Sequence, residues 1–138
     1  MSAHPYIVHF PIALIALSFI YEFLSLIRKD LLPKNIGLFI FIPGAISTIF
    51  AALTGEAAFK SAIDICPEAE RILYIHNQTA NFTTWVSIAV LLVWIFVILK
   101  KALSFQIKVL ITAFLFLLSI SVLTTGYLGG QLTHLYNI

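Results

Sequence analysis

Residues 79–99 read TANFTTWVSIAVLLVWIFVIL and contain no charged side chain. A helix needs about 20 apolar residues to cross about 30 Å of hydrocarbon, so this stretch is long enough to span a membrane. Three further apolar stretches occupy residues 6–27, 36–55 and 109–129. The four stretches use most of the 138 residues. The sequence therefore predicts an all-α integral membrane protein with a single four-helix transmembrane domain over residues 1–138.

The composition supports this class. Hydrophobic residues make up 61% of the chain and charged residues only 10%, whereas an ordinary soluble domain is about 25% charged. The formal net charge is +2 and the basic residues are scattered, so we expect no nucleic-acid partner. Cys66 is the single cysteine, which excludes an internal disulfide and the two-cysteine attachment of a c-type haem.

The charges of the connecting segments predict the orientation. Basic residues gather after the first and third stretches, at Arg28, Lys29, Lys34, Lys100, Lys101 and Lys108. Basic connections usually stay in the cytoplasm. We therefore expect an up-down-up-down bundle in a bacterial inner (cytoplasmic) membrane, with both termini on the outer, periplasmic side. In such a bundle the first and third spans lie diagonally.

All four histidines of the chain fall near the expected outer boundary. They are His4, His9, His76 and His134. Each lies within about five residues of the point where roughly 20 residues, counted from the basic side, leave the hydrocarbon. Pro67, followed by two glutamates, is a good helix start, so the third helix should begin outside the bilayer and hold His76 rigidly. The pattern predicts histidines from separate helices that converge on one outward-facing site.

Several motifs resemble a known family. They are the opening HPYIVHFPIAL (residues 4–14), the run AALTGEAA (51–58), the histidine near the start of the third helix and the ending GGQLTH (129–134). Together they resemble domain-of-unknown-function family 2231, a group of bacterial membrane proteins. The resemblance covers nearly the whole chain and implies a role in respiratory electron transfer. The family's four histidine positions map onto His4, His9, His76 and His134, although the glycine expected soon after the last histidine is missing here.

Clustered imidazoles at a membrane boundary suggest a b-type haem, which is flat and largely apolar and takes axial ligands from histidines. We expect His9 and His76 to ligate one haem. His4 and His134 would bind a second haem or hold the propionates of the first. Further donors to the propionates are expected from Arg71, the natural charge partner, and from Tyr6, Tyr74 and Gln131. The expected partners are the lipid bilayer, quinol and a periplasmic cytochrome or other respiratory subunits.

Other interpretations stay open. Three or four histidines with Glu56 or Asp64 could instead hold copper or zinc, since imidazole suits both metals. A small structural subunit of a respiratory complex is a third interpretation, and a second copy of the chain is a further candidate partner, in a homo-oligomer. The sequence shows no nucleophile with a base and no paired carboxylates, so we expect an electron carrier or subunit and not an enzyme. Glu22, the one acidic residue well inside a span, is expected to snorkel or to pair with Arg28.

Overall fold

The computed structural model describes residues 4–28, 32–61 and 65–136, without the side chains of residues 4–5 and 58–61. These ranges contain helices and no strand: α1 (His4–Ile7), α2 (His9–Ile27), α3 (Ile36–Ser61), α4 (Pro67–Leu99) and α5 (Phe105–Tyr136). Four of them, α2 to α5, are long and apolar enough to cross a membrane. The predicted all-α fold with four spanning helices is confirmed.

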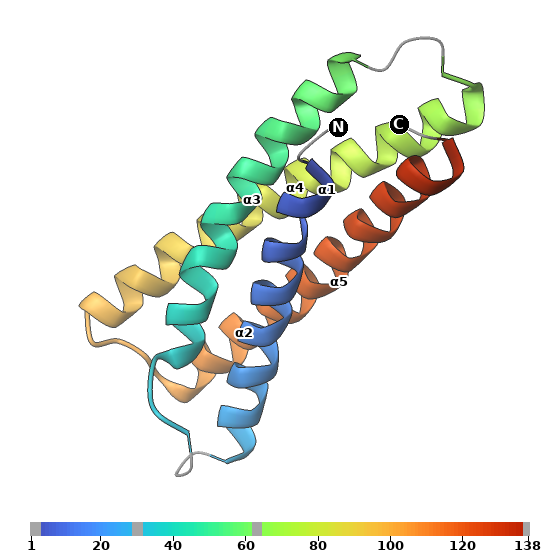
Figure 1. Ribbon diagram of the computed structural model, residues 1–138. Helices are drawn as coiled ribbons and strands as arrows, with labels where there is room; N and C mark the ends of the chain where they lie inside the picture. The colour runs from blue at the N-terminus through green and yellow to red at the C-terminus, as the bar shows by residue number, and fades with distance from the viewer. Residues whose placement is uncertain (1–3, 29–31, 62–64, 137–138) are drawn as a thin grey trace.

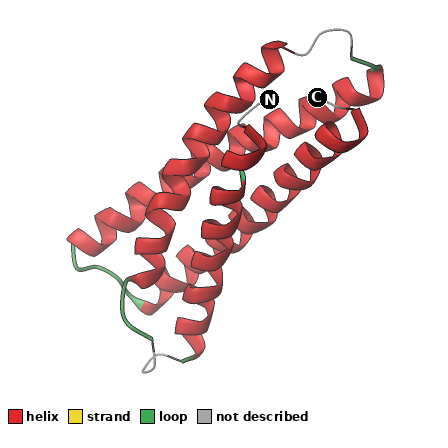
Figure 2. Ribbon diagram, viewed as in Figure 1, coloured by secondary structure: helices red, strands yellow, loops and turns green. Residues whose placement is uncertain are grey.

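The four long helices alternate in direction along one bundle (Figures 1 and 2). Within the bundle α2 packs against α3 and α5, and α4 packs against the same two helices. The first and third spans, α2 and α4, therefore lie diagonally, as predicted. Both termini lie at the end where α3 leads into α4. We call this the terminal end, and we call the opposite end, with the connections α2–α3 and α4–α5, the basic end.

A proline breaks the first span into α1 and α2. Pro11 has no N–H to offer the carbonyl of Ile7, and its ring crowds that carbonyl. The chain leaves helical bonding at Val8 although the dihedral angles there remain helical, with φ −64° and ψ −21°. The bond from the amide of Ile12 to the carbonyl of Val8 is long, at 3.4 Å. The distortion makes His9 the first residue of α2.

The centre of the bundle is mainly apolar, with a few buried hydroxyl groups such as those of Ser18 and Ser119. Ile15, Phe41, Leu115 and Leu118 are fully buried there. Phe41 of α3 packs on Trp94 of α4, with ring centroids 5.9 Å apart. In contrast, many large apolar side chains point outward, among them Phe10, Phe39, Phe50, Phe82, Trp85 and Phe96. Such a surface fits lipid and not water, so the protein is a multi-pass membrane protein in contact with the bilayer.

The structure corrects the predicted partner of Glu22. This side chain is buried, and its Oε2 lies 3.8 Å from the Nζ of Lys108 on α5. The hydroxyl of Ser25 donates to the same oxygen at 3.3 Å. Arg28, which the sequence spacing suggested, is not the counter-ion. The reason is that the side of α2 that carries Glu22 is buried against neighbouring helices, whereas Arg28 ends the helix and is exposed.

Candidate functional site

A cavity of about 360 Å³ lies between the helices at the terminal end of the bundle. Its walls come from all four spanning helices. Three histidines line it, His9 from α2, His76 from α4 and His134 from α5. The sequence-predicted convergence of these three residues is therefore observed. The backbone of His4 begins α1, but its side chain is outside the described part of the structure.

His76 is the most enclosed of the three rings and is held in place from α5. Its side chain is half-buried, whereas those of His9 and His134 are exposed. The Nδ1 of His76 lies 2.9 Å from the carbonyl oxygen of Thr125. A carbonyl can only accept, so Nδ1 carries the proton. In the neutral ring Nε2 then carries the lone pair, which is the form in which imidazole binds a metal.

Glycines of α5 set how closely the His76 ring approaches. A methyl group added at Gly129 would lie 3.1 Å from the Cε1 of His76. The same addition at Gly126 would meet the Cδ1 of Ile12 at 2.7 Å, whereas at Gly130 nothing lies within 4 Å. All three glycines line the cavity. The ring of His76 therefore packs on backbone at Gly129, and Gly130 leaves the wall beside it open.

The remaining walls are mostly apolar, with hydroxyl groups between the helices. Small and branched side chains from all four spanning helices make up the apolar part: Pro11, Ile12, Ala51, Ala52, Ala80 and Val122. The hydroxyls of Thr83 and Ser121 lie 2.6 Å apart and join α4 to α5. Thr84 donates to the carbonyl of Thr48 on α3 at 3.4 Å. These bonds fix the helices that carry the wall.

The other side chains predicted to contact a haem do not line the cavity. Arg71 and Tyr74 on α4, and Tyr6 on α1, are exposed and do not line the cavity, so their predicted contact with propionates stays a prediction. Gln131 donates from its Nε2 to the hydroxyl of Tyr127 at 3.0 Å. Tyr127 lines the cavity although the sequence analysis did not single it out. It lies seven residues, about two turns, before His134, so helical spacing could have found it.

The described histidines do not form a compact ion site by themselves. Among the residues whose side chains the structure describes, no three His, Cys, Asp or Glu groups are placed to hold a metal ion. Glu56 is exposed near the end of α3 and does not line the cavity, and Asp64 falls outside the described residues. Cys66 is exposed just before α4. A bare copper or zinc ion would therefore need a further ligand.

A family model covers the chain from end to end. The model described as "Predicted membrane protein (DUF2231)" matches residues 1–138. The chain belongs to the DUF2231 family. The resemblance inferred from its histidine and glycine motifs is thus confirmed, and the family description agrees with the four spanning helices. No curated protein and no solved structure showed significant similarity to this DUF2231 chain.

Proposed function

We propose that this DUF2231 protein binds a b-type haem in the cavity at the terminal end and carries electrons in a respiratory membrane. His76 and His9, from the diagonal helices α4 and α2, are the residues that would hold its iron. The observation that carries the proposal is the meeting of histidines from three helices at one cavity. Polar and ionisable residues within a membrane protein cost free energy and are usually functional. Three histidines around one cavity therefore favour a bound ligand.

The residues present fit such a group. The cavity volume of about 360 Å³ falls within the range of about 300–1,000 Å³ that is usual for ligand and cofactor sites. Apolar walls suit the body of a porphyrin, and the glycine backbone of α5 gives a wall without side chains. Tyr127 supplies a polar group at the same wall, and its hydroxyl accepts a hydrogen bond from Gln131. When bound, a haem would supply one-electron redox chemistry at this position.

The protein's own contribution is to hold and tune the ligands. The carbonyl of Thr125 keeps the proton of His76 on Nδ1 and sets the plane of the ring. Such a bond also raises the basicity of the ligating nitrogen. The break before α2, caused by Pro11, places His9 at a helix start facing the same cavity. His134 then serves as a polar partner at the cavity wall, or as a ligand if a second haem binds with His4.

A haem needs two protein ligands, whereas a structural zinc or copper site needs three or four. The absence of a three-ligand group among the described side chains therefore favours haem over a bare ion. Two histidines, which are enough for a haem, are compatible with this observation. The copper or zinc alternative becomes the better reading only if His4 proves to complete a cluster.

The proposed setting is the cytoplasmic membrane of a bacterium, with the basic end inside. In the sequence, six of the eight lysines and arginines stand in or beside the two connections of that end: Arg28, Lys29, Lys34, Lys100, Lys101 and Lys108. The terminal end would then face the periplasm. Because the centre of the bundle is filled by apolar side chains and holds no histidine, the protein would relay electrons at its outer face. Quinol or a partner subunit would be the donor and a periplasmic carrier the acceptor.

The test is an absorption spectrum of protein purified in detergent from haem-replete cells. We expect a Soret band and a haem content, by pyridine haemochrome, of at least one per chain. His76→Ala should lose most of the bound haem, while Phe82→Leu, an exposed position of α4 that does not line the cavity, should retain it. Wild-type protein without haem, or equal haem in wild type and His76→Ala, would contradict the proposal.

A further inference from the structure

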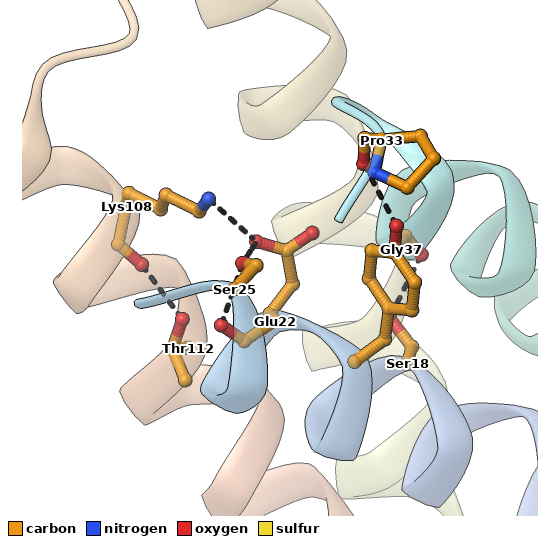
Figure 3. Close-up of polar contacts among 8 residues, drawn as sticks. Ser18, Glu22, Ser25, Pro33, Gly37, Lys108 and Thr112 are labelled. Carbon is orange, nitrogen blue, oxygen red and sulfur yellow. Dashed lines mark hydrogen bonds and ion pairs between the residues drawn. The ribbon is translucent and has the colours of Figure 1, made fainter. Parts of the chain in front are cut away.

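A second cavity, of about 260 Å³, lies at the basic end of the bundle, opposite the end that holds the histidine-lined cavity. Its volume is roughly nine times the 30 Å³ that a water molecule occupies in the liquid. Polar side chains line it together with apolar ones: Tyr21, Glu22, Ser25, Lys34, Asn35 and Lys108. Figure 3 shows Glu22 between Lys108 and the start of α3. The proposed haem function uses none of these residues.

The carboxylate of Glu22 is fixed at the wall. Its Oε2 receives a hydrogen bond from Ser25 and faces the ammonium of Lys108 at 3.8 Å. On the other side it packs against Gly37 of α3, where a methyl group could not be added without a clash. The hydroxyl of Tyr21 is held by the carbonyl of Pro33 at 2.8 Å. The wall is thus built from α2, α5 and the segment before α3.

The charges that line this cavity favour an anion. Lys34 and Lys108 contribute two positive charges and Glu22 one negative charge. The amino-terminal ends of α3 and α5 border the cavity at Asn35 and Phe105, against the one carboxyl-terminal end of α2. Helix amino termini carry partial positive charge. The ammonium of Lys108 lies 3.8 Å from Glu22, which is beyond hydrogen-bond distance, so the carboxylate takes none of its three N–H donors.

We propose that this cavity binds a phosphate group, most naturally that of a membrane phospholipid headgroup, through Lys34 and Lys108. Basic pockets between helices on the cytoplasmic side are a known way of holding such headgroups. Leu26, Leu32 and Phe105 also line the cavity and give the glycerol and acyl carbons an apolar wall. A free phosphate ion would satisfy the same two ammonium groups but would not use the apolar wall.

The test measures the binding of lipids to the full chain in neutral detergent micelles. Phosphatidylglycerol and inorganic phosphate are titrated separately, and the thermal unfolding temperature reports binding. We expect phosphatidylglycerol to stabilise the protein at lower concentration than phosphate. Lys34→Gln and Lys108→Gln should each lower the affinity for phosphatidylglycerol by about fivefold. This is the usual contribution of one basic side chain near an anionic headgroup. Lys100→Gln, which removes an exposed charge at the same end outside the cavity, should leave affinity unchanged.

Glu22→Gln gives the sharpest contrast. It keeps the shape of the side chain and removes the negative charge beside Lys108, so phosphatidylglycerol should bind more tightly. A cation site would behave in the opposite way and lose its ligand. A response to phosphate alone, at equal or lower concentration than lipid, would support the phosphate chemistry and identify free phosphate as its source. Loss of affinity in Lys100→Gln equal to that in Lys34→Gln, or weaker binding in Glu22→Gln, would overturn the proposal.

Discussion

The Nδ1 of His76 on α4 lies 2.9 Å from the carbonyl oxygen of Thr125 on α5, at the wall of the cavity that His9 and His134 also line. This bond turns an interfacial histidine into an oriented one. The proton on Nδ1 is donated to the carbonyl oxygen of Thr125, and the ring is held between α4 and α5. An orienting acceptor behind a ligating imidazole is what metal sites commonly use, and its loss costs about tenfold to a hundredfold in affinity.

Gly129→Ala tests whether the position of the His76 ring matters. The added methyl group would stand 3.1 Å from the ring, which must move by a few tenths of an ångström. We expect haem affinity to fall by about tenfold and the ring NMR signals of His76 to shift. The measurement is a haem titration together with a spectrum of histidine-labelled protein.

Gly130→Ala is the matched control for the fold. Nothing lies within 4 Å of the added methyl group, and alanine favours a helix over glycine by up to about 1 kcal/mol. Its thermal unfolding temperature should equal or exceed that of the wild type, with the His76 signals in place. Unchanged His76 signals in Gly129→Ala would show that the close approach does not position the ring.

Gly37→Ala should be the most damaging of the glycine substitutions. Its methyl group would overlap the buried side chain of Glu22, where α2 meets α3. Overpacking of this kind costs about 1–3 kcal/mol of unfolding free energy. In a Glu22→Ala background the space is vacated, so the same change should cost much less. Unfolding of the four proteins in detergent gives this coupling directly, and equal costs in both backgrounds would refute the contact.

Ser87→Ala should leave the protein as stable as the wild type or more stable. The side chain is fully buried, and its Oγ has no hydrogen-bond partner among the described residues. Removing an unsatisfied hydroxyl relieves a desolvation cost, and alanine is a better helix former, so we expect a gain of up to about 1 kcal/mol. Destabilisation by Ser87→Ala would reveal a partner for this hydroxyl.

Thr83→Ala, one turn away on α4, should behave in the opposite way. Thr83 bonds Ser121 across the α4–α5 interface at 2.6 Å. Such bonds between membrane helices are worth about 0.6 kcal/mol, with a maximum of about 1.7 kcal/mol. A double-mutant cycle with Ser121→Ala, measured by unfolding in micelles, isolates the coupling free energy of this hydrogen bond. A coupling of zero would mean that the bond does not contribute.

Hydropathy predicted the number and order of the helices but not their ends. The expected spans 36–55, 79–99 and 109–129 lie within α3, α4 and α5, which extend to Ser61, from Pro67 and to Tyr136. Hydropathy detects the part of a helix that suits hydrocarbon, whereas helical hydrogen bonding continues into polar sequence. Pro67 was the local signal that revealed one of these extensions, and the structure confirms it.

The site was partly predictable for the same reason. The level of each histidine follows from counting residues along a span, so the meeting of His9, His76 and His134 could be foreseen. Contacts across helices could not, because they depend on the rotation of each helix about its own axis. The bond of His76 to Thr125 and the pairing of Glu22 with Lys108 in place of Arg28 both depend on that rotation.

The central claim is that imidazoles from α2 and α4 share one haem. Electron paramagnetic resonance of the oxidised, purified protein tests it most directly, because it distinguishes iron with two axial histidines from iron with one. We predict a low-spin signal in the wild type and in His134→Ala, and a high-spin signal in His9→Ala. A low-spin signal that survives in His9→Ala, or a wild-type protein with no haem signal, would contradict the account.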